Sequence, residues 1–134
     1  MSRGVLIVST DVAPGGLVGA IDIIEETYEF MLAYAAQGRV NDEDMSSAGI
    51  RNYLQKSNEA LAVIAAAKLP GAAAQNFLDV VRQDAVKASA AIRLVLEQPA
   101  VSSQMIDNLN ASIHLRALLT DLFLLDETLK LTES

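Results

Sequence analysis

The segment from Ile113 to Leu125 constrains the fold most, because it reads IHLRALLTDLFLL and is apolar on nearly every side. A helix on the surface of a globular protein needs an apolar stripe only about 100° wide to face its core. A helix that is apolar most of the way round must be enclosed by its own chain, by a second copy or by another protein. The sequence therefore predicts a helical protein in which this segment is covered.

The composition favours one helical domain. The chain has 134 residues, of which 51% are hydrophobic, so it is long enough to bury a substantial core. Alanine and leucine dominate the hydrophobic residues and only 4% of residues are aromatic, a balance that favours helices. This capacity for burial argues against disorder. We expect an N-terminal arm over residues 1–16 and a single helical-bundle domain over residues 17–131.

The residue types that the chain lacks exclude several kinds of chemistry. There is no cysteine, which removes disulfides, thiolate metal sites and cysteine nucleophiles. The net charge is −7, whereas nucleic-acid binding and membrane-surface helices need basic residues. The apolar run from Gly4 to Val8 ends too soon for a signal peptide, and no stretch reaches the ~18 apolar residues of a membrane span. We therefore expect a cytoplasmic protein that binds neither nucleic acid nor membranes.

Four segments of helical length lie between clear breaks. The breaks are Pro14-Gly15-Gly16, Gly38 with Asn41-Asp42, Pro70-Gly71 and Pro99, all of which contain residues that interrupt helices. We expect helices over about 17–37, 46–68, 72–97 and 102–131. Short turns between four helices predict an all-α, up-down-up-down four-helix bundle. Gly49 costs roughly 1 kcal/mol inside a helix, so a broken second helix is the alternative.

Each of the first three segments carries one apolar seam with alternating spacings of three and four, the pattern of a helix face that packs on a core. The first seam is Leu17, Ile21, Ile24, Tyr28, Met31 and Ala35; the second is Ile50, Leu54, Ser57, Leu61 and Ile64; the third is Leu78, Val81, Ala85, Ala88, Ile92 and Val95.

The last segment carries two apolar stripes. The first is Ile106, Leu109, Ile113, Ala117, Thr120 and Leu124, and the second is Leu115, Leu118, Leu122, Leu125 and Leu129. We expect the first stripe to face the bundle. The second has the spacing of a short leucine zipper and predicts an interface with another subunit or partner. The alternative is that both stripes belong to one internal core.

The N-terminal arm contains a short strand-like run followed by glycines, which prompts comparison with a nucleotide-binding turn. Such a turn holds phosphate on backbone N–H groups at a helix N-terminus. The stretch from Ala13 to Gly19 has neither the G-x-G-x-x-G spacing nor a G-K-[ST] sequence. No later segment offers parallel strands. We expect the arm to pack on the bundle or on a neighbouring subunit.

An acidic face lies opposite the first seam. It consists of Asp22, Glu25, Glu26 and Glu29. The simplest interpretation is a solvated surface, and the alternative is an electrostatic docking face for a basic partner. A di-iron bundle needs two Glu-x-x-His pairs, and the residue three before the single histidine is Ala111. We expect no metal site and no cofactor.

His114 is the only histidine and therefore the natural candidate for general acid–base or phosphotransfer chemistry. Phosphotransfer bundles place a lysine three residues and a glycine four residues after their histidine, where this chain has Ala117 and Leu118. A calcium loop beginning at Asp42 would need glycine at its sixth and an acid at its twelfth position, which are Ser47 and Tyr53. No catalytic residues are assigned.

The function expected from these patterns is that of a non-catalytic interaction protein: a scaffold, adaptor or accessory subunit that forms a homodimer or higher homo-oligomer. The first alternative is a small acidic assembly or secretion-type chaperone that holds an amphipathic client segment. The second alternative is a His114-dependent phosphotransfer or cofactor-binding bundle.

Overall fold

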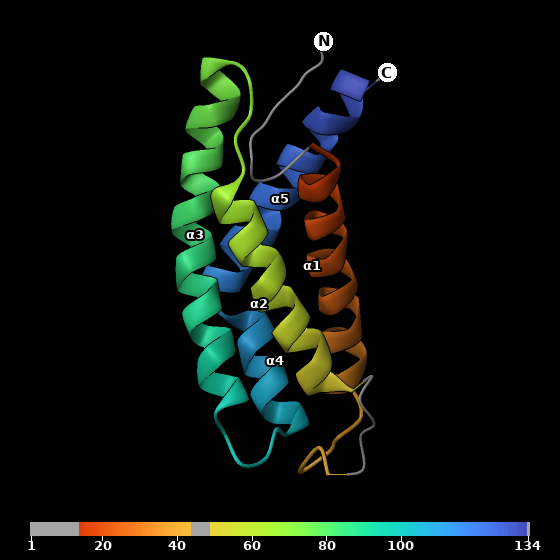
Figure 1. Cartoon of the computed structure of the whole chain (residues 1–134). Helices are drawn as coiled ribbons and strands as arrows, with labels where there is room; N and C mark the ends of the chain where they lie inside the picture. The colour runs from red at the N-terminus through yellow and green to blue at the C-terminus, as the bar shows by residue number, and fades with distance from the viewer. Residues whose placement is uncertain (1–13, 44–48, 134) are drawn as a thin grey trace.

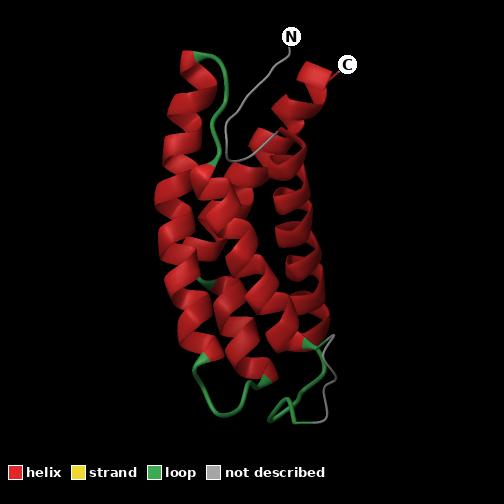
Figure 2. Ribbon diagram, in the orientation of Figure 1, coloured by secondary structure: helices red, strands yellow, loops and turns green. Residues whose placement is uncertain are grey.

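The computed structural model describes residues 14–43 and 49–133, and all the regular secondary structure in these ranges is helical, as expected (Figure 2). The helices are α1 (Pro14–Ala35), α2 (Ile50–Ala66), α3 (Ala72–Leu96), α4 (Ser103–Ala111) and α5 (Ile113–Glu133). None of these helices combines the length and the apolar character that crossing a membrane requires. The expected arm falls almost wholly outside the described residues.

Figure 1 shows α1, α2 and α3 as long neighbouring helices, with α4 and α5 following one another along the remaining side. The contacts agree with this view, because α1 packs on α2 and α4, α2 packs on α3, and α3 packs on α5. The core lies between the helices, and all three expected seams line it: each seam residue is buried except Tyr28 and Ala35, which are partly buried against the core.

The last predicted helix is broken into α4 and α5 at Ser112. The φ and ψ angles of Ser112 are −58° and 132°, outside the helical region, and its N–H donates to the carbonyl of Leu109. Its own carbonyl accepts from the N–H of Arg116. Ser112 therefore ends one helix and begins the next. Periodicity could not reveal the break, because serine is only a moderately poor helix former.

One predicted helix start also needs correction. Pro14-Gly15-Gly16 was expected to separate the arm from the first helix, but α1 begins at Pro14. Proline fits the first helical turn because the N–H it lacks would have no partner there. The second helix begins at Ile50 with Gly49 as its N-cap, so glycine lies at the boundary rather than inside the helix. The predicted start at residues 46–47 lies outside the described residues.

The proposed leucine interface is internal core. Leu115, Leu118, Leu122 and Leu125 are buried within the single chain, and Leu129 is partly buried against them. These leucines are enclosed because α5 packs on α1, α3 and α4. The interpretation of this stripe as a subunit interface is therefore wrong.

The other stripe does not face the bundle along its whole length either. Ile106 and Leu109 of α4 are buried, but Ile113 and Leu124 of α5 are 72% and 57% exposed. The break at Ser112 explains the difference, because a stripe drawn across it does not follow one continuous helix.

Candidate functional site

Three acids of the predicted acidic face of α1 line two different grooves, one beside α5 and one beside α2. Glu25 and Glu29 line a groove on the α5 side, whereas Glu26 lines a groove against α2. Asp22 is exposed and acts electrostatically on Glu25. Three of the four acids therefore lie along two neighbouring grooves, and the part that faces α5 is the part that gains further acidic residues.

A groove of about 440 Å³ lies between α1 and α5, and we call it the acidic groove. The α5 residues in it were missed from the sequence, because Asp126 directly follows the core residue Leu125 and has no apparent acidic neighbour other than Glu127. Asp126 is only 8% exposed. The residues that line the acidic groove are Glu25, Tyr28, Glu29, Leu32, Phe123, Asp126, Glu127 and Lys130.

Negative charge dominates the acidic groove. Four carboxylates line it together with a single cation, Lys130, whose Nζ lies 3.4 Å from Oδ2 of Asp126. Burial raises the pKa of Glu25, and the charges of Asp126 and Asp22 raise it further, although Lys130 acts in the opposite direction. The charge of Asp126 also raises the pKa of Lys130. The groove can therefore accept additional positive charge.

The acidic groove also has an apolar component. Leu32 of α1 and Phe123 of α5 are each about half exposed, at 48% and 49%, and Tyr28 is partly buried against the core. Large apolar side chains next to acids give a surface that can contact both an apolar side chain and a cation. This combination is typical of a docking site for an amphipathic segment.

A second pair of carboxyl groups lies between α3 and α5. Asp121 contacts Asp84 of α3, and its Oδ2 atom is buried without a hydrogen-bond partner among the described residues. Burial, together with the hydrogen bond and charge of Asp84, raises the pKa of Asp121 to about 7. A proton shared between the two carboxyl groups would supply the donor that this oxygen lacks.

A different arrangement, in which the charge of an acid is paired with that of an arginine, occurs where the α1–α2 and α3–α4 connections meet. Arg51 donates from Nε to Oδ2 of Asp42 (2.5 Å), from Nη1 to the carbonyl of Leu96 (2.9 Å) and from Nη2 to that of Gln98 (2.8 Å). The N–H of Val101 donates to Oδ1 of Asp42 (3.0 Å). Burial acts to raise the pKa of Asp42, but the hydrogen bonds from Arg51 and Val101 lower it below its ordinary value.

Tyr34 and Ser103 extend this network to α1 and α4. The Tyr34 hydroxyl donates to the carbonyl of Val101 (2.6 Å), and the Ser103 hydroxyl donates to the carbonyl of Tyr34 (2.7 Å). We call these residues, with Arg51 and Asp42, the polar junction. The polar groups of the junction form hydrogen bonds with one another and with backbone atoms, so its role is to join four helices.

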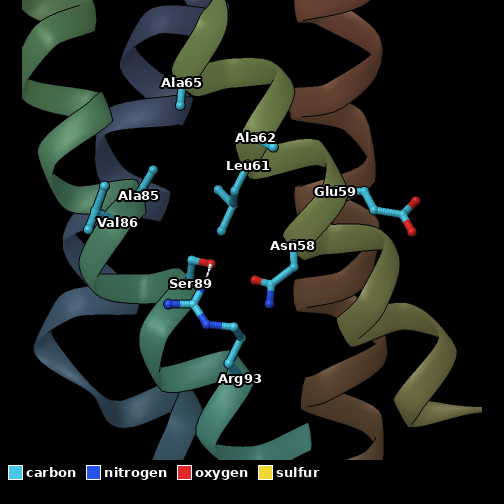
Figure 3. A pocket seen from close by; sticks show the side chains of 9 residues that line it. All are labelled: Asn58, Glu59, Leu61, Ala62, Ala65, Ala85, Val86, Ser89 and Arg93. Atoms are coloured by element: carbon cyan, nitrogen blue, oxygen red, sulfur yellow. Dashed lines mark hydrogen bonds between the residues drawn. The ribbon is translucent and has the colours of Figure 1, made fainter.

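A groove of about 460 Å³ lies between α2 and α3 (Figure 3). Leu61 points into its middle with small side chains around it, and Arg93 donates from Nη1 to the Ser89 hydroxyl at 2.9 Å. The Oδ1 atom of Asn58 is buried without a hydrogen-bond partner among the described residues. The lining residues are Asn58, Glu59, Leu61, Ala62, Ala65, Ala85, Val86, Ser89 and Arg93.

His114 is exposed at the second position of α5. The residues three and four positions away from it are Asn110, Ala111, Ala117 and Leu118, so it has no carboxylate neighbour on its own helix. Within residues 14–43 and 49–133, no three histidine, aspartate or glutamate side chains are close enough to hold a metal ion together.

Comparisons of this chain with protein-family models, with curated proteins and with solved structures find no match. The geometry of the grooves is therefore the basis on which a function is proposed.

Proposed function

We propose that this chain is a non-catalytic interaction protein of the cytoplasm, built as an up-down-up-down bundle whose fourth side consists of α4 and α5. It acts as a scaffold, adaptor or accessory subunit by holding a segment of another protein in the acidic groove. The observation that supports this proposal is the combination of a nearly buried acid, Asp126, with the half-exposed Leu32 and Phe123 in one groove.

A partner segment bound in the groove would gain free energy from two sources. Covering Leu32 and Phe123 removes apolar surface from water, at about 25 cal/mol per Å². The acids around them supply orientation and attract a partner of opposite charge. Neither effect requires a catalytic group or a cofactor.

Site-specific cross-linking in cells tests the proposal. A photoreactive residue at position 32 in the groove is compared with one at position 94 on α3, where Leu94 is also highly exposed. We expect one discrete protein cross-linked from position 32 and not from position 94. The additional change Glu29→Lys should abolish that product, because it reverses a charge that lines the groove. Equal products from both positions, or no effect of Glu29→Lys, would contradict the proposal.

Self-association is a second candidate, and the α2–α3 groove favours it. A two-fold dimer needs a patch that is complementary to itself, and this groove has a cation, Arg93, beside the exposed Val86, with the acid Glu59 at its edge pointing away from its centre (Figure 3). Small residues around its middle would let a second copy approach closely. This surface replaces the buried leucine stripe as the expected contact between subunits.

Light scattering over a dilution series measures self-association directly. We expect a dimer mass that falls to the monomer mass for Val86→Lys. The control is Val40→Lys, which changes an even more exposed valine outside the groove and should leave the mass unchanged. A monomer at every concentration would exclude the dimer and leave the cross-linking proposal intact.

The chaperone hypothesis uses the same acidic groove but differs in the state of the bound protein. A chaperone holds a client segment before the client folds, whereas an adaptor binds the folded partner. The cross-linked protein, added in folded and in denatured form, distinguishes the two.

A further inference from the structure

The acidic groove already contains one cation, Lys130, beside Asp126, where a cation of a bound partner would also be favoured. Lys130 lies one helical turn after Asp126 and reaches back to it. Its side chain is 66% exposed, and the 3.4 Å separation from Asp126 is longer than the 2.7–2.9 Å of a strong charge-assisted hydrogen bond. The most buried carboxylate in the groove is therefore paired with a largely exposed side chain, at a distance longer than that of a strong charge-assisted hydrogen bond.

Resting on the proposed function, we infer that the partner segment is a basic amphipathic helix, and that one of its lysine or arginine side chains displaces Lys130 from Asp126. Its apolar face would cover Leu32 and Phe123.

The charge balance selects a basic partner. Glu25, Glu29 and Glu127 surround the Asp126–Lys130 pair, so that four acids face one lysine. A further cation relieves their mutual repulsion, which is strong enough to contribute to the raised pKa of Glu25. An arginine would bind better than a lysine, because its guanidinium can contact two carboxylate oxygens at once.

The spacing of the lining residues selects a helix. Glu25, Tyr28, Glu29 and Leu32 lie on one side of α1 with spacings of three, one and three, and they extend over about 10 Å of helix axis. Phe123, Asp126, Glu127 and Lys130 repeat the same spacings on α5. A helix laid along this groove would place side chains against both rows with its own spacing of three and four.

A second copy of this chain is a poor occupant of the acidic groove. A two-fold contact through the groove would bring the same four acids from each copy together, and like charges in close apposition oppose association. The net charge of −7 adds to this repulsion at longer range.

The test uses the full chain and three synthetic peptides about four helical turns long. They share one pattern of leucines and carry lysine, glutamine or glutamate at the polar positions. Binding is followed by NMR, with the signals of Leu32 and Phe123 as reporters. We expect the lysine peptide to shift these signals most strongly, and its affinity to fall as the salt concentration rises.

The variant Lys130→Met tests the displacement. Removal of the internal competitor should tighten binding of the lysine peptide about two- to fivefold, the size of one partly exposed charge pair. The control Lys87→Met removes an exposed lysine from α3, outside the groove, and should change the affinity less than twofold. Equal tightening by the two variants, or none by Lys130→Met, would overturn the displacement of Lys130.

The three peptides also separate this inference from the proposed function. If the glutamine peptide shifts the reporter signals as strongly as the lysine peptide, the groove binds helices but the basic partner is wrong. If no peptide shifts Leu32 or Phe123, binding of amphipathic segments in the acidic groove fails, and the proposed function fails with it. Shifts spread evenly over the acidic surface would indicate unspecific attraction and overturn the inference.

Discussion

Asp42 of the polar junction and Asp126 of the acidic groove are equally buried but differently surrounded. The side chain of each is 11% exposed. Asp42 is bonded by Arg51 and by the N–H of Val101. Asp126 forms an ion pair with Lys130 and lies among further acids. The first carboxylate holds the connections between helices, whereas the second is placed where an additional cation would stabilise it.

Burial alone therefore does not show what a charged residue does. A buried charge that is fully paired contributes to the structure only as long as its partners are present. One that is weakly paired at the surface of a groove can form better interactions with another molecule. The sign and size of mutational effects should therefore differ between the two regions.

The largest effect is expected for Arg51→Met. This change leaves Asp42 without its cation and two carbonyl groups without their donor, and we expect the free energy of unfolding to fall by about 3 kcal/mol. Urea denaturation followed by circular dichroism measures the change. Arg116→Met, at an exposed arginine on α5, is the matched control and should cost less than about 0.5 kcal/mol. Similar losses for both arginines would remove the distinction between the junction and the surface.

The matched pair Asp42→Asn and Asp126→Asn tests the comparison directly. We expect Asp42→Asn to lower the free energy of unfolding by about 2 kcal/mol, because it weakens the bonds with Arg51 and Val101. Asp126→Asn should change it by less than about 0.5 kcal/mol, because the loss of the Lys130 pair is offset by reduced repulsion from neighbouring acids. The same urea titration measures both variants. Equal destabilisation would show that Asp126 is a structural residue.

A smaller effect, of the order of 1 kcal/mol, is expected from the pH dependence of Asp121. Its pKa in the folded chain is about 7 against an ordinary value of 3.8, so the folded state binds the proton more tightly. The resulting stability is present below about pH 4 and is lost as the pH rises towards 7. The difference in unfolding free energy between the wild type and Asp121→Asn, measured from pH 4 to pH 8, should follow this curve. A constant difference would contradict the shared proton.

Asp42 should give the opposite dependence. Its pKa lies below 3.8, so its contribution is present above that pH and is lost as the pH falls through the lower, folded-state value. The two carboxylates therefore titrate in separate ranges, and a urea series extended below pH 4 measures both.

The sequence predicted the seams of the first three helices well, because each seam is a local pattern that a continuous helix preserves. It failed at Ser112, where one serine with ordinary helix propensity leaves the helical region and ends the continuity of the stripes. It also favoured an interface with a partner for the stripe from Leu115 to Leu129, since both stripes are largely apolar and only the packing of α5 on α1, α3 and α4 places this stripe in the core.

The candidate site was predictable only in part. The α1 acids were visible as a face, but the sequence does not show that Glu25 and Glu29 meet Asp126, which lies about a hundred residues later. The polar junction was invisible for another reason. Tyr34 and Arg51 bind backbone carbonyl groups there, and a carbonyl group has no signature in a sequence.

The bond between Tyr34 and Val101 has a consequence for how the chain folds. It joins residues 67 positions apart, whereas α1 with α2 and α2 with α3 pair with neighbours in sequence. The entropy lost when a loop closes grows with its length, and contacts between distant residues slow folding. We therefore expect the three consecutive helices to associate first and the hydrogen bonds of the polar junction to form last. Interactions that are absent from the folding transition state affect the rate of unfolding rather than the rate of folding.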